Sequence, residues 1–429
     1  MSPLKRRDLL SLGLPALPLA FVALPLYVIW PHYFANRFDV SLGLIGGLLL
    51  LARTLDALLD PVLGHWSDRL FLRGNHILLK RGWLAASGLS LGFVVLFFPH
   101  WLFGHSVTLN SLLLLVLLAL LACYLGYSFL QISLQAWGAR LGGDTDVRSR
   151  IVGWREGLAL AGVILASVVP GWLGMEALVS GFVLLLVVSM WAWWHAPRPE
   201  PSIAMNNATA LKPWWRGLQQ PWGHAGFRRL LGVFILNGIA SAIPATLMLF
   251  FVQDRLQLPA SAQAQFLGAY FLAAAVSVPL WLQAIARWGL RRCWLAGMLL
   301  AVAVFIWTLG LAAGDEIGYT VVCVLSGLTL GVDLIAPGAL LNGMLQTSQN
   351  EGAHSGAYFG WWQVATKLNL ALAAGVTLPL LQWLGYESGS RDAPALLALS
   401  WAYALLPCVL KLLAGALLWA SAKPLQSME

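Results

Sequence analysis

Apolar stretches of about twenty residues recur along the whole chain, and a helix needs such a length to cross a bilayer. Of the 429 residues, 59% are hydrophobic and 10% are charged, whereas soluble domains carry about 25% charged residues. Lipid must therefore surround most of this chain. Twelve stretches qualify, at residues 12–36, 42–66, 78–99, 107–138, 151–173, 176–195, 227–252, 262–286, 292–313, 317–345, 355–383 and 394–420.

These stretches predict an all-α membrane protein with twelve transmembrane helices. Within hydrocarbon, only helices and closed β-barrels satisfy every backbone polar group, and the apolar runs are too long and uniform for barrel strands, which alternate. The first 28 residues superficially resemble a signal peptide, but their apolar part is long, so we expect a retained first helix. We expect no metal site and no cofactor, because the cysteines lie in predicted spans without metal-site spacing, at Cys123, Cys293, Cys323 and Cys408.

Basic residues lie mainly on one side of the predicted membrane. With successive loops assigned to alternating sides, 19 of the 26 Lys and Arg residues lie on the side of the N-terminus, 3 lie opposite and 4 lie within spans. The positive-inside rule then places both termini in the cytoplasm. Topology accounts for the net charge of +8, so we expect no nucleic-acid partner.

A long polar segment divides the chain into two halves. Residues 196–224 are rich in Pro, Asn and Gln, and they separate the sixth predicted span from the seventh. A basic turn follows the second span of each half, as "GHWSDRLFLRGNHILLKRGW" and as "ARWGLRRCW". Such a plan is typical of transporters built from repeats. We predict an N-terminal six-helix bundle over 1–196, a cytoplasmic linker over 197–225 and a C-terminal six-helix bundle over 226–429.

Charged residues interrupt the second predicted span. Arg53, Asp56 and Asp60 lie at i, i+3 and i+7, so they share one face of a helix. Each ionised side chain near the bilayer centre costs about 2.5–3.5 kcal/mol and normally faces a cavity or a partner. Two carboxylates one turn apart repel unless a guanidinium, a bound cation or a shared proton relieves them. The segment is therefore either an Arg–Asp pair that joins helices or a site for a coupling cation or proton.

Three sequence blocks resemble one family of transporters. They read "DALLDPVLGHWSDR", "YSFLQISLQAWGARLGGDTDVRSRIVGWREG" and "EGAHSGAYFGWWQVATK". They are similar to the melibiose permease family, the glycoside–pentoside–hexuronide:cation symporters of the major facilitator superfamily. Because the blocks lie in both halves, the resemblance covers the whole chain, and it implies the major facilitator fold of two six-helix bundles.

The resemblance implies roles for several residues. In that family the two second-helix carboxylates bind the coupling cation, which assigns this role to Asp56 and Asp60, and Arg53 matches a neighbouring arginine. Sodium-using members add a fourth-helix carboxylate, where this chain has Gln131. Glutamine offers a carbonyl oxygen but no charge, so we expect H+ rather than Na+ as the coupling ion.

The fourth and fifth spans carry further polar residues that predict a solute site. Tyr124, Ser128, Gln131 and Gln135 recur at i, i+4, i+7 and i+11, a stripe that either lines a cavity or joins helices by hydrogen bonds. We predict that Tyr127 and Gln135 contact the solute or a gate. Arg155 matches a family arginine near the gate, although it could equally pair with the adjacent Glu156 at the membrane interface.

The solute site departs from the sugar site of the family. The first-helix aspartate and the fourth-helix tryptophan of the melibiose carrier fall at Pro18 and Gln135, so melibiose is not predicted as the solute. The basic residues Arg53, Arg155 and Lys367 suit an anionic or amphipathic solute better.

Two more charged residues lie within spans of the second half. Asp333 precedes Pro337, and Lys367 matches an eleventh-helix lysine of the family. The simplest expectation is that Asp333 and Lys367 neutralise each other across neighbouring helices. Such a pair could be structural, or it could open during turnover as a switch.

These features predict a secondary active transporter that moves a small solute by alternating access as a cation symporter. The alternative is a lipid or lysolipid carrier on the same fold. We expect no enzyme activity, because no Ser–His–Asp order, HExxH or phosphate loop is present. The expected setting is a monomer in the bilayer of a bacterial inner membrane.

The topology can be tested with fusions to Glu429 and to the loop at residues 386–393. Because of the 19-to-3 basic asymmetry, we expect a fluorescent protein at Glu429 to fold in the cytoplasm and alkaline phosphatase in the loop to be active in the periplasm. Phosphatase activity from the Glu429 fusion would contradict the predicted orientation.

Overall fold

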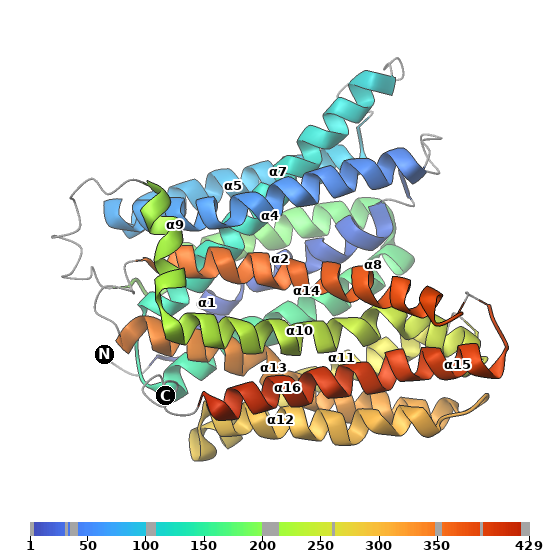
Figure 1. The fold of residues 1–429 in the computed structure, drawn as a ribbon. Coiled ribbons are helices and arrows are strands. Elements are labelled where there is room, and N and C mark those ends of the chain that lie inside the picture. Colours follow the sequence, from blue (N-terminus) through green and yellow to red (C-terminus); the bar gives the residue numbers. More distant parts are fainter. Residues whose placement is uncertain are drawn as a thin grey trace. The chain divides into compact units, whose positions relative to one another are not determined.

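The computed structural model describes residues 4–30, 33–34, 42–99, 109–199, 214–259, 262–347, 354–386 and 389–421 (Figure 1). Within these ranges the regular elements are all helices. This confirms the expected all-α class, and it follows from the long apolar runs, whose backbone groups can bond only within their own helix in hydrocarbon.

The first half of the chain forms helices over its six predicted spans. The first span begins with three short elements, α1 (Arg6–Gly13), α2 (Ala16–Leu24) and η1 (Pro25–Ile29). The remaining spans form four long helices, one of which covers two spans: α4 (Leu42–Arg73), α5 (Asn75–Phe97), α7 (Leu109–Arg140) and α8 (Thr145–Trp194).

Two glycines end helices in this half. Gly74 separates α4 from α5 with φ 123°, and Gly174 interrupts α8 with φ 82°. Both angles lie in the left-handed region that side chains with a Cβ rarely adopt. The break at Gly174 divides α8 into the fifth and sixth spans, as the two separate apolar runs predict.

The second half follows the predicted order of spans. The linker contributes α9 (Trp214–Gly223), and the middle of the predicted linker, residues 200–213, lies outside the described ranges. The helices that follow are α10 (Ala225–Phe250), η3 (Phe251–Arg255), α11 (Ala262–Trp288), α12 (Leu290–Phe305), η4 (Ile306–Gly310), α13 (Glu316–Thr347), α14 (Ser355–Trp383), α15 (Ala393–Ser400), η6 (Trp401–Leu405) and α16 (Leu406–Ala420).

Eleven helical segments of the described chain are long and apolar enough to cross a membrane. Helix α4 has the length for a twelfth span, with 32 residues, but it carries Arg53, Asp56 and Asp60 near its middle. The chain is therefore a multi-pass membrane protein, and α4, which holds the predicted cation site, carries three charged residues near its middle.

The chain divides into two compact units. Unit 1 comprises residues 1–143, 150–221 and 348–364, and unit 2 comprises residues 144–149, 222–347 and 365–429. Helix α14 belongs to both, since its first ten residues are part of unit 1 and the rest are part of unit 2. The domain boundaries expected from the sequence, at 196/197 and 225/226, remain a prediction.

Close backbone contacts hold the helices of unit 1 together. Helix α7 packs against α4 and α5. A Cβ on Gly92 of α5 would lie 2.7 Å from the Ala119 carbonyl oxygen of α7, and one on Gly126 would lie 2.8 Å from that of Ala85. Small residues thus let helices pack without a hydrophobic driving force between them.

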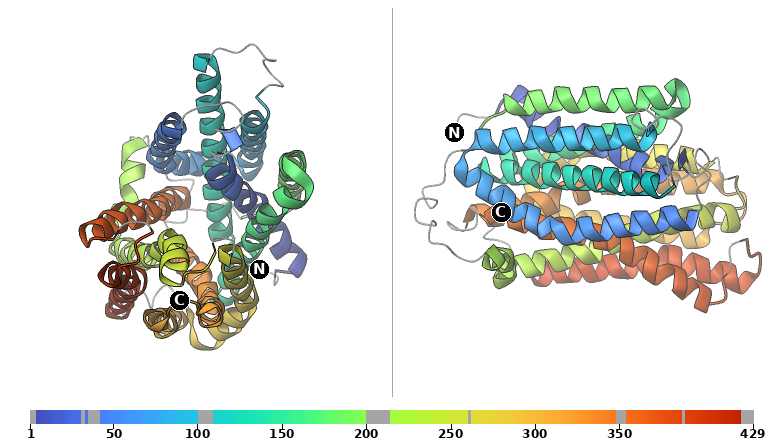
Figure 2. Two further views of the ribbon diagram at one scale, coloured as in Figure 1. Left: turned by 90° about the vertical axis from the view of Figure 1, so that its right-hand side faces the viewer. Right: turned by 90° about the horizontal axis from the view of Figure 1, so that it is seen from above.

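Unit 2 has its own apolar core. Helix α11 packs along α13, and α16 packs along α10 and α12 (Figure 2). The core includes the rings of Phe251, Phe266, Tyr319 and Tyr403, all buried. Stacking of Phe251 on Tyr403, with ring centroids 4.1 Å apart, ties η3 to η6.

A polar network links Tyr386 and Gly389, between α14 and α15, to the end of η3. Asp254 accepts hydrogen bonds from the Tyr386 hydroxyl and from the Gly389 N–H. Burial raises the pKa of Tyr386, and the bond to Asp254 acts in the same direction. The phenol therefore remains protonated and keeps donating to the carboxylate at any physiological pH.

Candidate functional site

Two carboxylates lie fully buried in the middle of α4. Asp56 is 1% exposed and Asp60 is 0% exposed, whereas Arg53 is exposed in unit 1. The three residues share one side of the helix as expected, but only the two acids are enclosed. Because burial of an ionised carboxylate is costly, a neighbouring donor, cation or proton must stabilise the pair.

The polar stripe of α7 faces these carboxylates. The Ser128 hydroxyl donates to Oδ1 of Asp56 at 2.8 Å. Tyr127 lies within electrostatic range of both Asp56 and Asp60, and Arg53 lies within range of Tyr124. Gln131 follows Ser128 by about one helical turn, and it is half-buried whereas Ser128 is buried. The stripe therefore joins α7 to α4 through Ser128, which places a hydroxyl group beside Asp56.

Arg155 forms an ion pair with its neighbour in α8. Its Nε and Nη2 donate to Oε1 of Glu156 at 3.0 and 2.7 Å, and Arg155 is 7% exposed. The sequence left this pair and a gating role equally open, and the structure contains the pair. The charge of Arg155 is thus partly compensated within the first half of the chain.

Gln135 meets the start of α14 within unit 1. The Gln363 side-chain amide donates to Oε1 of Gln135 at 3.2 Å, and both side chains are buried. Gln135 was expected to contact a solute or a gate, and its observed partner is a residue from the second half of the chain. That partner could not be identified from spacing, because the two residues are more than 200 positions apart.

A second cluster holds the N-terminal end of α14. Asp68 accepts hydrogen bonds from the backbone N–H groups of Gly356 and Ala357, at 2.7 and 2.9 Å. Nη2 of Arg140 donates to Asp68 at 2.7 Å, and its Nε donates to the Ser355 hydroxyl at 2.8 Å. A carboxylate at this position satisfies free N–H groups and complements the positive end of the helix dipole.

The sequence did not predict this cluster, although its residues lie in the three blocks that resemble the transporter family. Asp68 lies two residues beyond the predicted end of the second span, and Arg140 lies two beyond the fourth. Both resembled ordinary loop charges at a membrane surface. One feature of the sequence could have indicated the pair. Asp68 and Arg140 lie at the same depth, each two residues beyond a predicted span that carries buried polar residues.

Helices α4 and α14 approach each other closely at this end of unit 1. A Cβ added to Gly64 or to Gly356 would collide with the backbone carbonyl of the other residue. One turn further along α14, a Cβ on Gly360 would lie 2.7 Å from the Asp60 carbonyl oxygen. The glycines bring α14 against the backbone of α4 beside the buried acids.

Unit 2 contains a separate buried ion pair. Nζ of Lys411 donates to Oδ2 of Asp333 at 2.7 Å and to Oδ1 of Asn237 at 2.8 Å, and Trp294 Nε1 donates to Oδ1 of Asp333 at 2.9 Å. The expected pairing of Asp333 with Lys367 is therefore wrong. The partner of Asp333 is Lys411 on α16, whereas Lys367 lies half-buried on α14.

The fold and the charged residues buried within its helices define a polytopic membrane carrier. The family model for MFS/sugar transport proteins matches residues 11–421. The chain therefore belongs to this family of the major facilitator superfamily, whose members are carriers rather than enzymes.

Relatives with similar sequences match only part of their own length. The Danio rerio sodium-dependent lysophosphatidylcholine symporter 1-A is 23% identical over 41% of this chain and 33% of that protein. The putative glycoside/cation symporter YagG of Escherichia coli (strain K12) is 25% identical over 39% of this chain and 35% of that protein. The matched stretch thus spans about a third of each relative.

The fold is also similar to that of solved carriers. An outward-facing structure of a bacterial homologue of the iron transporter ferroportin aligns over 98% of this chain and 100% of that chain, with 16% identity and a TM-score of 0.71. This likeness supports the expected major facilitator fold of two six-helix bundles.

The role of Asp68 can be tested by Asp68→Asn. Asparagine removes the charge that Arg140 requires and leaves one acceptor for two backbone donors, so we expect the free energy of unfolding to fall by about 3–5 kcal/mol. Hydrogen exchange should accelerate at Gly356 and Ala357. Asp392→Asn, at an exposed position, is the matched control. Unchanged exchange at both amides would show that Asp68 does not hold α14.

Proposed function

We propose that the chain is a secondary active carrier that moves a small solute across a bacterial inner membrane, coupled to a cation bound by Asp56 and Asp60. The burial of both carboxylates in the middle of α4 carries this proposal. Acids at this depth are costly and usually functional. Their neighbours are the oxygen-bearing side chains that a proton or a small cation requires.

We favour a proton as the coupling ion. Ser128 donates its hydroxyl hydrogen to Asp56, so this oxygen already interacts with a donor. The residue one turn further along α7 is Gln131, which adds no negative charge. A sodium ion would therefore have two carboxylates at most, whereas a proton needs only one of suitable pKa.

Alternating access also requires a gate, and we assign that role to the Asp68 cluster. Asp68 and Arg140 bind the first turn of α14, and α14 continues into unit 2. Breaking these bonds would release α14 from α4. At Gly64 and Gly356 the backbones of α4 and α14 are in direct contact. We therefore expect α14 to have two separate positions, one in contact with α4 and one released from it, rather than a continuous range.

The solute belongs to one of two classes. The family description favours a sugar-like solute, whereas the zebrafish relative is described as a lysophosphatidylcholine symporter and favours an amphipathic one. Reconstituted protein should be given a radiolabelled methyl glucuronide, an anionic sugar, and a radiolabelled lysophosphatidylcholine in separate assays. Lipidomic comparison of a deletion strain with its parent would distinguish the classes in cells.

The predicted setting is part of the same proposal. The carrier acts as a monomer with both termini in the cytoplasm, and Arg53, Tyr127, Gln135, Arg155, Asp333 and Lys367 remain the residues proposed to contact the solute or a gate. Arg155 is paired with Glu156 and Asp333 is paired with Lys411. We therefore propose that Arg155 and Asp333 also stabilise the fold.

The role of the buried acids predicts a separation of coupling from transport. In Asp56→Asn and in Asp60→Asn, uphill uptake of the transported solute should be lost while exchange of labelled for unlabelled solute continues, because the charge that binds the cation is gone. Both variants should fold, since each removes a charge costing about 2.5–3.5 kcal/mol in the membrane. Uptake, exchange, expression and melting temperature are measured together.

Two results would contradict this role. If the acids only neutralise Arg53, each variant should melt early, because a guanidinium within a span would lose its counter-charge, and a charge near the bilayer centre costs about 2.5–3.5 kcal/mol. Stable protein with full uphill uptake would remove the acids from coupling altogether. Glu316→Gln, at an exposed position in α13, controls for the general effect of losing a carboxylate.

The choice of ion predicts the behaviour of Gln131→Asp. A third carboxylate beside Asp56 and Asp60 should create a sodium site, so NaCl should raise the melting temperature of this variant relative to choline chloride. The parent protein should respond equally to both salts. A parent that is itself stabilised by sodium would reverse our choice of ion, and Gln131→Glu tests the same charge with a longer side chain.

A further inference from the structure

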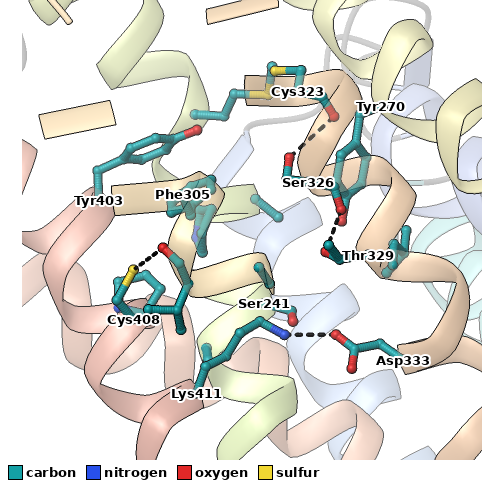
Figure 3. A pocket seen from close by; sticks show the side chains of 18 of the residues that line it. Ser241, Tyr270, Phe305, Cys323, Ser326, Thr329, Asp333, Tyr403, Cys408 and Lys411 are labelled. Carbon is teal, nitrogen blue, oxygen red and sulfur yellow. Dashed lines mark hydrogen bonds and ion pairs between the residues drawn. The ribbon is translucent and has the colours of Figure 1, made fainter. Parts of the chain in front are cut away.

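A pocket of about 140 Å³ lies inside unit 2, apart from the buried acids of unit 1 (Figure 3). It is lined by residues of α10, α11, α12, α13, η6 and α16. An engineered apolar cavity of about 150 Å³ in another protein is known to bind benzene. The pocket therefore has room for a ligand with one ring or a short chain.

One end of the pocket is rigid and aromatic. Phe305 lies against Tyr403, with ring centroids 5.3 Å apart, and the Tyr403 hydroxyl hydrogen-bonds that of Tyr319 at 2.6 Å. Ser326 and Thr329 donate their hydroxyl hydrogens to carbonyl groups of their own helix, α13. These bonds occupy the hydroxyl hydrogens of Ser326 and Thr329 within α13.

The other end carries the Lys411–Asp333 pair, which Figure 3 shows across the pocket from Tyr403 and Cys323. The side chains are 11% and 9% exposed. Lysine has three N–H donors. Among the described residues, Asp333 and Asn237 accept two of them, so a third remains for an acceptor within the pocket.

The charges at this end select against ionised ligands. A carboxylate drawn to Lys411 would meet Asp333, and an ammonium drawn to Asp333 would meet Lys411. Leaving either member of a buried pair uncompensated is strongly unfavourable. A neutral oxygen can instead accept the remaining N–H of Lys411 without disturbing the pair.

We propose that this pocket of unit 2 is a binding site for a small uncharged amphiphile, an aromatic ring or short aliphatic body bearing one hydroxyl or carbonyl group. The apolar body lies among Phe305, Tyr403 and Met248, and the oxygen accepts a hydrogen bond from Lys411. The site does not involve the two acids of unit 1, Asp56 and Asp60, so it can exist whether or not those acids couple transport.

Benzyl alcohol, toluene, benzoate and benzylammonium are suitable probes, since they share a ring and differ in the polar group. Binding to the purified full-length protein is measured by saturation-transfer NMR and by the shift in melting temperature. We expect benzyl alcohol to bind about tenfold more tightly than toluene, benzoate or benzylammonium, because only the alcohol supplies a neutral acceptor.

Two alanines on α12 give a matched pair of variants. Ala301 lines the pocket, whereas Ala303, two residues along, is exposed. We expect Ala301→Leu to fill the pocket and abolish benzyl alcohol binding, and Ala303→Leu to bind as the parent does. Equal binding by both variants would assign the signal to detergent or surface and overturn the site.

The polar end is tested by the double variant Lys411→Met and Asp333→Leu. Removing both charges avoids leaving one of them buried alone. Its affinity for benzyl alcohol should fall to that for toluene, while toluene binding stays as in the parent. Undiminished preference for the alcohol, or tight binding of benzoate to the parent protein, would overturn the proposed ligand class.

Discussion

Hydrocarbon offers neither hydrogen bonds nor counter-ions, and the buried polar groups of the described spans are placed under that constraint. The backbone meets it by forming helices throughout the described spans. The charged side chains meet it by compensation inside each unit. Asp68 binds Arg140, Arg155 binds Glu156 and Asp333 binds Lys411, each with an N···O distance of 2.7 Å. For the two acids of α4, a proton or cation is proposed as an additional ligand.

The same constraint changes what holds helices together. Lipid and side chains are equally apolar, so close packing and polar contacts replace the hydrophobic effect. In unit 1 the glycines of α4, α5, α7 and α14 allow backbone contact, and Ser128 and Gln363 add hydrogen bonds across helices. The most polar packing thus coincides with the residues proposed to bind the cation and to form the gate.

The two units use their buried charges differently. In unit 1 the acids, the α7 stripe and the start of α14 form one connected set, which suits a site whose occupancy must affect helix contact. In unit 2 the ion pair lies at one end of an apolar pocket, and its charges cancel. A neutral pair beside a cavity is suited to recognising a neutral oxygen. These two arrangements explain why a coupling role is proposed for one unit and a ligand pocket for the other.

The sequence alone determined the class of protein, the order of its spans and the presence of charged residues within the second span. Hydropathy and the helical period of 3.6 residues are local properties, so they can be read without the fold. The period also placed Asp56 and Asp60 on the same face as each other, and that face is buried in the structure. Partners were a different matter. Asp333 was expected to meet Lys367 and binds Lys411, and Asp68, which looked like a loop charge, holds the start of α14. Periodicity predicts which residues share a face of one helix. Which residues meet across helices depends on how helices distant in sequence are rotated and packed, and only the tertiary structure decides that.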